Sequence, residues 1–276
     1  MFEFKPKMQT IKDRMLEVWS AGDFGVIAKI IEPEGYAFIN RLDIKPDSKV
    51  LDVACGNGNL SIPAAKIGAR VTGLDFVPNL IRQAEERAQS ENLEIRFDVG
   101  DAEAMPYGDN EFDFVVTMFG AMFCPRTEVI VNELLRVCKP GGTIAMANWT
   151  PEGFIGRFFK LGASYLPPPP GVPSPVSWGT PSNVTERFGN RVSDLRFNRI
   201  ILKMQMQMTA PEVVEHFITY FGPTNKLYEM LNFKNKIKFR NDLEELYGEN
   251  NISGSDDVTV ESEYLEVTAK KVASVN

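Results

Sequence analysis

The sequence predicts an α/β fold with a doubly wound, mostly parallel sheet. Between residues 45 and 150, apolar runs typical of buried strands alternate with amphipathic helical runs, and this alternation favours a parallel sheet covered by helices on both faces. At 276 residues with 43% hydrophobic content, the chain can bury a substantial core. A glycine-rich turn follows the first apolar run, where open sheets of this kind bind ligands.

A helical segment is expected before this core. Apolar residues recur at near-helical spacing between positions 8 and 31, with interruptions at Gly22 and Gly25. Pro46-Asp47-Ser48 is a turn sequence, and an apolar strand follows directly. We therefore expect residues 1–44 to form a helical lead-in that lies against a core of residues 45–150.

Within the core, strands and helices should alternate along the chain. Pro78 suits the first turn of a helix, because its fixed φ and missing N–H cost nothing there. The apolar patterns predict strands at 49–54, 70–75, 94–98, 112–118 and 143–148, and helices from about 59, over 78–90 and near 126–138.

The regular alternation stops after residue 150. Residues 164–182 contain too many prolines for a helix or a strand, so this stretch is either a surface loop or a lid over an acceptor site. The remaining patterns predict a short helix at 181–188, a strand at 200–208, helices at 211–220 and 226–247, and a strand at 263–271. We expect residues 151–257 to form an acceptor-side cap with late strand and helices, and residues 258–276 to complete the core sheet.

Composition limits the classes of partner and compartment. A net charge of −7 and a pI near 5.0 argue against nucleic acid, because phosphate binding requires clustered cations. The cysteines Cys55, Cys124 and Cys138 are odd in number and lack C-x-x-C spacing, which indicates buried thiols in a reducing compartment. We found neither an apolar leader nor a charge-free stretch near 20 residues. We therefore expect a cytoplasmic protein without a membrane span.

The most informative segment is the turn within Val50-Leu51-Asp52-Val53-Ala54-Cys55-Gly56-Asn57-Gly58. Gly56 and Gly58 lack a Cβ, so they can adopt positive φ and let a ligand approach the backbone. A dinucleotide-binding turn normally completes G-x-G-x-x-G, but Ser61 occupies the third glycine position. The carboxylate of Asp52 also suits a cation better than a pyrophosphate.

With this acid and G-x-G turn, the sequence resembles the class I S-adenosylmethionine-dependent methyltransferases. Four further segments match that family in order and spacing: 71–76 as its second strand, 100–106 as its adenine-side loop, 112–117 as its fourth strand, and 135–142 as its turn into the fifth. The subgroup that it resembles contains the ubiquinone and menaquinone C-methyltransferases, also called methyltransferase type 11. The resemblance implies a Rossmann-like, seven-stranded sheet whose last strand is antiparallel.

The resemblance also implies how S-adenosyl-L-methionine would be bound. Asp52 would contact the methionine ammonium end, directly or through water, and Asp75 would accept hydrogen bonds from the ribose hydroxyls. Asp101 would accept from the adenine amine, with the Ala102 N–H beside it. The other expected cofactor-binding residues are Ala54, Gly56, Gly58, Phe76 and Thr117. Each role has a purely structural alternative: Asp52 could cap a turn, Asp75 could complement the dipole at a helix N-terminus, and Phe76 could belong to the core.

Aromatic residues suggest an apolar acceptor pocket. The expected lining residues are Phe119, Phe123, Trp149 and Trp178, although each could equally be part of the core. His216 is the single histidine and thus the weak candidate for a general base, but on its helix it projects largely away from the apolar stripe. A solvated histidine is the favoured interpretation. We expect no metal site, because no carboxylate or imidazole cluster has ligand spacing.

Together these features predict an S-adenosylmethionine-dependent methyltransferase that acts on a small apolar or aromatic molecule. Two alternatives remain open at this point: a nicotinamide-dinucleotide-dependent oxidoreductase, and a non-catalytic S-adenosylmethionine-binding partner subunit. No motif identifies the acceptor or the atom that is methylated. The acidic surface and the lead-in helices permit a homodimer.

Overall fold

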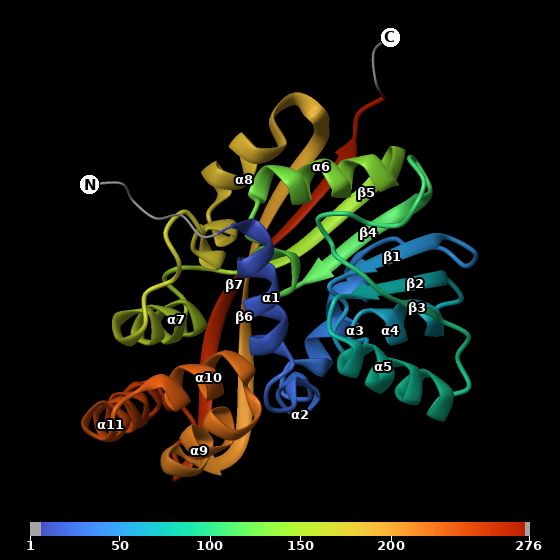
Figure 1. The fold of residues 1–276 in the computed structure, drawn as a ribbon. Helices are drawn as coiled ribbons and strands as arrows, with labels where there is room; N and C mark the ends of the chain where they lie inside the picture. The colour runs from blue at the N-terminus through green and yellow to red at the C-terminus, as the bar shows by residue number, and fades with distance from the viewer. Residues whose placement is uncertain (1–6, 274–276) are drawn as a thin grey trace, which may run out of the picture.

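The computed structural model describes residues 7–273 and is built around one seven-stranded sheet (Figure 1). The strand order is β3-β2-β1-β4-β5-β7-β6. Strands β1 to β5 pair in parallel, whereas β7 runs antiparallel between β5 and β6. The predicted α/β fold and antiparallel late strand are therefore confirmed. The strands are β1 (Lys49–Val53), β2 (Arg70–Asp75), β3 (Arg96–Val99), β4 (Phe112–Met118), β5 (Cys138–Trp149), β6 (Val192–Thr209) and β7 (Asp257–Lys271).

Helices cover both faces of the sheet, and a separate helical group gathers near its antiparallel end (Figure 1). In Figure 1, α1 passes in front of the sheet, between the parallel strands and the group formed by α7, α9, α10 and α11. The helices are α1 (Met8–Trp19), α2 (Phe24–Ala28), α3 (Glu32–Arg41), α4 (Ser61–Lys66), α5 (Pro78–Ser90), η1 (Ala121–Phe123), α6 (Thr127–Val137), α7 (Phe154–Tyr165), η2 (Pro175–Gly179), α8 (Pro181–Phe188), η3 (Gly189–Arg191), α9 (Ala210–Tyr220), α10 (Gly222–Met230) and α11 (Phe233–Glu249).

Central strands are buried on both faces, which explains their continuous apolar sequences. Val50, Leu51 and Val53 of β1 are fully buried, and β1 pairs with β2 on one side and β4 on the other. Strands covered on both faces by crossover helices need apolar residues at successive positions. This core brings the carboxyl ends of the parallel strands to one edge of the sheet.

Several elements differ from the sequence-based expectation: α7 was not expected, and β5 and β7 begin at residues 138 and 257 rather than at 143 and 263. Helix α3 lies within the expected helical lead-in, beyond the apolar pattern of residues 8–31, and burial of Phe38 and Ile39 stabilises it. Strand β6 begins eight residues earlier than residue 200, because its polar first half pairs with β7. The expected helix at 226–247 is divided into α10 and α11, since the Asn232 side chain accepts from the Asn235 N–H (2.9 Å) and starts a new helix.

The segment after residue 150 contributes both cover and sheet. Its strand β6 forms one edge of the sheet, while α7 and α9–α11 pack together beside it. The proline-rich stretch 164–182 contains η2, in which Trp178 is fully buried. Across residues 7–273, none of the helices combines the length and the apolar character needed to cross a membrane.

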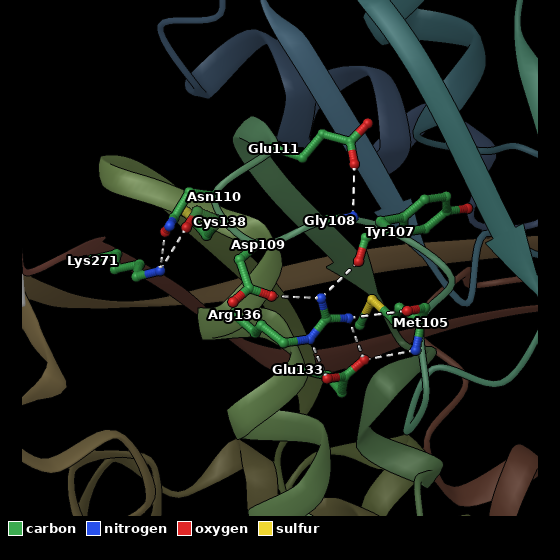
Figure 2. Close-up of polar contacts among 10 residues, drawn as sticks. All are labelled: Met105, Tyr107, Gly108, Asp109, Asn110, Glu111, Glu133, Arg136, Cys138 and Lys271. Atoms are coloured by element: carbon green, nitrogen blue, oxygen red, sulfur yellow. Dashed lines mark hydrogen bonds and ion pairs between the residues drawn. The ribbon is translucent and has the colours of Figure 1, made fainter.

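Arg136 of α6 fixes the loop that leaves β3. Its guanidinium donates to the carbonyl oxygens of Tyr107 (2.6 Å) and Met105 (2.9 Å), and to the carboxylates of Glu133 (2.6 Å) and Asp109 (3.0 Å), as Figure 2 shows. Glu133 also accepts from the Met105 N–H at 2.6 Å. One cation thus satisfies two backbone carbonyls and two carboxylates, so helix and loop are held as one unit.

Replacing this cation should be costly. Arg136→Ala is expected to lower the free energy of unfolding by roughly 2–4 kcal/mol, because it leaves partly buried acceptors unpaired. Arg82→Ala is the matched control, since Arg82 makes only exposed contacts, an ion pair with Glu86 (3.5 Å) and a hydrogen bond to Asn79 (2.5 Å), and should cost at most about 0.5 kcal/mol. Urea denaturation of both variants checks this, and equal losses would contradict the assigned network.

Candidate active site

A cavity of about 350 Å³ opens at the carboxyl ends of the parallel strands. Residues that follow β1, β2, β3 and β4 form one side of it, and α1 covers the other side. This is the position at which open α/β sheets bind ligands. Of the expected site residues, those that line the cavity are Ala54, Gly56, Asp75, Phe76, Asp101, Ala102, Phe119 and Phe123.

Two strand ends in the cavity wall adopt left-handed backbone conformations. Ala54 after β1 has φ 54°, and Phe119 after β4 has φ 55°, although residues with a Cβ rarely adopt such angles. A Cβ added to Gly120 would lie 2.6 Å from the Ala54 carbonyl oxygen, so the two loops pack directly on each other. Backbone strain of this kind concentrates at functional sites. Both strained residues line the cavity.

Asp75 lies at the end of β2, and the backbone fixes its carboxylate. The Gly56 N–H donates to Oδ2 and the Val77 N–H donates to Oδ1, each at 2.9 Å. Burial raises the pKa of Asp75 to about 6, against the lowering effect of these backbone donors, so the group is ionised at neutral pH. A carboxylate has about four acceptor positions. The acceptor positions that the backbone does not use remain for donors in the cavity.

Asp101, in the loop after β3, is linked to helix α1. Its carboxylate accepts from the Glu103 N–H (2.8 Å) and from the Lys12 ammonium. Lys12 also pairs with the buried carboxylate of Glu103 (2.7 Å), which pairs in turn with Arg126 (2.7 Å). Burial lowers the pKa of Lys12, but its hydrogen bonds to Asp101 and Glu103 outweigh this and raise it overall. These ion pairs hold α1 over the cavity.

Asp52 lies behind the glycine-rich turn, outside the cavity lining. The Ser61 hydroxyl donates to its Oδ2 at 2.6 Å, so the residue in the third glycine position supports this acid. Burial raises the pKa of Asp52 to about 7, although hydrogen bonds from Ser61 oppose the increase. The structure thus places Asp52 where it shapes the turn, without direct access to a ligand in the cavity. Of the two expected contacts between Asp52 and the methionine ammonium end, this position therefore leaves only the one through water.

Three other expected site residues support the cavity wall from behind. Gly58 has φ 89° and packs near the apolar side chains of α4 and α5. Thr117 is buried and its Oγ1 accepts from the Ala121 N–H at 3.0 Å, which fixes η1. The Trp149 ring stacks on Phe119 with 3.7 Å between centroids and 5° between planes. None of the three lines the cavity.

Trp178 and His216 lie elsewhere. Trp178 is fully buried, with the Arg187 guanidinium 4.3 Å from its ring centroid. His216 of α9 packs 4.9 Å from the Tyr220 ring, and burial lowers its pKa. Neither residue lines the cavity, and the proline-rich stretch 164–182 contributes no lining residue either.

An aromatic cluster forms the apolar end of the cavity. Trp19 ends α1, Phe24 begins α2 and Phe123 lies on η1. The Trp19 ring makes edge contacts with Phe123 (4.9 Å between centroids) and Phe24 (5.6 Å). All three rings line the cavity. This cluster can hold an apolar or aromatic group by area burial and by edge-to-face contacts.

Sequence reasoning missed the residues that α1 and α2 contribute. Lys12, Trp19 and Phe24 belong to segments that were expected to be helical, but helical periodicity does not indicate which surface a helix covers. No motif marked them either. Cys124, a further lining residue, was interpreted only as a buried thiol.

Comparisons with known proteins agree with this geometry. A family model described as "Methyltransferase domain" matches residues 50–142. The uncharacterized protein Rv1403c of Mycobacterium tuberculosis is 39% identical over 217 residues, which are 78% of this chain and 79% of that protein. Demethylmenaquinone methyltransferase of Renibacterium salmoninarum is 37% identical over 128 residues, or 46% and 52% of the two chains.

The fold is also shared with a solved structure. Phosphoethanolamine N-methyltransferase 2 of Haemonchus contortus, in complex with S-adenosyl-L-methionine, superposes with a TM-score of 0.56 at 18% identity, covering 87% of this chain and 53% of that one. The family model and the sequence relatives, together with the motif order, show that the chain belongs to the class I S-adenosylmethionine-dependent methyltransferases, and the solved structure shows that the fold is shared. Its cofactor is S-adenosyl-L-methionine, and the resemblance inferred from the sequence is confirmed.

The cavity residues fit this cofactor. Asp75 retains acceptor positions for a vicinal diol, and the backbone at Ala54 and Gly56 is bare enough for close approach. Apolar side chains of Phe76, Leu80 and Val99 can flank a purine. Among residues 7–273, no group of three or more potential metal ligands is found.

The buried acid behind the turn should make stability depend on pH. The pKa of Asp52 rises from an ordinary 3.8 to about 7 on folding, so the native state holds a proton that the unfolded chain releases. This contribution is present below pH 3.8 and is lost as the pH rises through about 7. Asp52→Asn removes the charge, keeps an acceptor for Ser61, and should gain roughly 2–3 kcal/mol relative to wild type between about pH 5 and pH 8.

Urea denaturation across this pH range measures the difference. Asp43→Asn is the control, because the Asp43 side chain is 87% exposed, and its difference from wild type should stay level. A level difference for Asp52→Asn as well would show that Asp52 titrates as an ordinary aspartate.

Proposed function

We propose that this methyltransferase modifies a small apolar or aromatic acceptor, bound at the end of the cavity formed by Trp19, Phe24 and Phe123. The observation that carries the proposal is this aromatic cluster, which lines the same cavity as Asp75 and Asp101. An apolar lining suits an apolar acceptor, because each aromatic contact removes apolar surface from water.

Within the cavity, the cofactor would lie along the strand ends. Asp75 accepts from the ribose hydroxyls, Asp101 accepts from the adenine amine beside the Ala102 N–H, and Phe76 flanks the purine. The backbone of 54–56 would hold the methionine part, and the activated methyl group would serve an acceptor bound at the aromatic cluster. Asp52, Gly58 and Thr117 support these loops from behind.

Methyl transfer requires little chemical participation by the side chains. The bound sulfonium supplies an activated methyl group. The chain's own residues orient the acceptor and exclude water, and such positioning can supply much of the acceleration. His216 lies outside the cavity, so the proposal assigns no proton transfer to it. Burial raises the pKa of the Cys124 thiol, so this lining residue stays neutral and is a poor competing nucleophile.

Residues 7–44 and 151–257 would form the cover on the acceptor side, and residues 1–6 of the expected lead-in lie outside the described part of the chain. Helix α1 lies over the cavity through the Lys12 ion pairs, and α10 contacts α1 from the later segment. Residues 45–150 would then bind the cofactor, and the described part of 258–276, up to residue 273, would complete the sheet. The cofactor therefore enters the cavity either when α1 moves away or through the opening of the cavity beside α1.

The sequence left two alternatives open, and family membership disfavours the first, a nicotinamide oxidoreductase. Ser61, at the third glycine position of a dinucleotide-binding turn, also disfavours it, because its hydroxyl donates to Asp52. A non-catalytic binding subunit shares the fold and the cofactor site. Incubation with methyl-labelled S-adenosylmethionine and a cell extract separates it from an enzyme, because only an enzyme labels a small molecule that mass spectrometry can identify. Label confined to protein or nucleic acid would contradict the proposed acceptor class.

The assigned ribose contact predicts a loss of cofactor affinity. Asp75→Asn should weaken S-adenosylhomocysteine binding by roughly 1.5–3 kcal/mol, the range for hydrogen bonds to a charged group. Asp98→Asn is the control: Asp98 lies on β3, bonds Tyr107 (2.9 Å) and is not a lining residue. Isothermal titration calorimetry measures both, and unchanged affinity in a folded Asp75→Asn protein would argue against the assignment.

The assigned acceptor end predicts a different pattern. Trp19→Leu and Phe123→Leu should raise the KM for the labelled acceptor at least about five-fold, because each removes aromatic area worth roughly 1–2 kcal/mol. Affinity for S-adenosylhomocysteine should change by less than about two-fold. If both variants lose cofactor affinity and keep the acceptor KM, the two ends of the cavity have been assigned in reverse.

A further inference from the structure

Helix α11 presents an exposed face whose two halves carry opposite charge. Residues 233–240 contain four cations and no acid, whereas residues 241–249 contain four acids and no cation. The opposite face of the helix is buried through Phe239, Leu243 and Tyr247. In Figure 1, α11 lies at the periphery of the molecule, beyond α9 and α10. The exposed residues of its outer face are Phe233, Lys234, Ile237, Lys238, Asn241, Glu245, Gly248 and Glu249.

This charge order opposes the dipole of the helix itself. A helix is stabilised by acids near its N-terminus and by cations near its C-terminus, but α11 has no acid in its first turn and no cation in its last. Of the charged residues on the outer face, Lys238 takes part in the helix's own packing, because it donates to the Tyr165 hydroxyl of α7 at 3.2 Å. Within residues 7–273, Lys234, Glu245 and Glu249 take part in no ion pair, whereas Lys238 pairs with Asp242 (2.6 Å).

We propose that the outer face of α11 binds the same face of a second copy of this chain, with the two helices antiparallel. The midpoint of α11 is Asn241, so full overlap places Asn241 opposite its own counterpart. Lys234 then lies opposite Gly248 of the second copy, between Glu245 and Glu249. By symmetry the same contacts form twice, as an isologous interface requires.

An antiparallel second copy removes both the charge and the dipole conflict. The acidic half of one helix lies along the basic half of the other, and its acids lie near the N-terminus of that helix. Phe233, which is 80% exposed, lies beside Gly248 of the other copy. An added Cβ at Gly248 would have no atom within 4 Å, so the surface there is open to an aromatic ring.

The same face fits other occupants less well. An anionic membrane surface or an acidic peptide would attract Lys234 and Lys238, but Glu245 and Glu249 of the same face would repel it. The interface would also be small. A 17-residue helix is about 25 Å long, so the buried area falls below that of standard stable complexes. We expect a weak dimer whose Kd rises with salt concentration.

Complementary charge reversal tests the pairing. An acidic-face variant carries Lys234→Glu with Lys238→Glu, and a basic-face variant carries Glu245→Lys with Glu249→Lys. Each alone should dimerise at least about ten-fold more weakly than wild type in sedimentation velocity at low salt, because like charges then face each other. An equimolar mixture should recover association as a heterodimer. Circular dichroism confirms that each variant is folded.

A control variant carries the same change of net charge at positions outside the α11 face. Lys29→Glu with Lys203→Glu changes net charge equally at exposed positions away from α11 and should dimerise as wild type does. A wild type that stays monomeric up to about 1 mM, or a mixture that does not associate, would overturn the proposal. Wild-type binding to phosphatidylglycerol vesicles that the acidic-face variant loses, without any dimer, would assign the face to a membrane instead.

Discussion

The organisation of the site depends on one carboxylate at the end of β2. Asp75 accepts hydrogen bonds from the N–H groups of Gly56 and Val77, so it joins the glycine-rich turn after β1 to the start of α5. Burial raises its pKa to about 6, and without the two backbone donors the charge would be more costly still. The constraint that shapes the turn therefore also leaves a carboxylate in the cavity wall, which is the acceptor that we propose for the ribose hydroxyls of the cofactor.

Around Asp75, the residues that support the cavity wall differ from the residues that line the cavity. Asp52, Thr117 and Trp149 are buried and fix the turn, η1 and the Phe119 ring from behind. The residues that face the cavity come from strand ends on one side and from α1 and α2 on the other. This division explains why conformationally strained residues such as Ala54 persist, because the packed layer behind them determines their position.

The sequence was most informative where one local signal decides the structure. The bounds of β2 and α5 match the expectation, because an apolar run ends at Asp75 and Pro78 suits a first helical turn. The division at Asn232 was missed, since a polar cap inside a helical pattern is easily interpreted as part of an exposed face. The sequence did not distinguish Trp149 and Trp178 from cavity-lining residues. An aromatic residue suits a buried position behind the cavity wall as well as a position in the wall itself. The contribution of α1 depends on tertiary packing, which periodicity does not encode.

A crystal structure of the protein with S-adenosylhomocysteine tests the proposed cofactor site most directly. We expect both ribose hydroxyls to donate to the Asp75 carboxylate, with adenine beside Asp101 and the homocysteine sulfur directed toward Trp19 and Phe123. A ligand bound elsewhere, or an Asp75 carboxylate that still contacts only the backbone N–H groups of Gly56 and Val77, would contradict it.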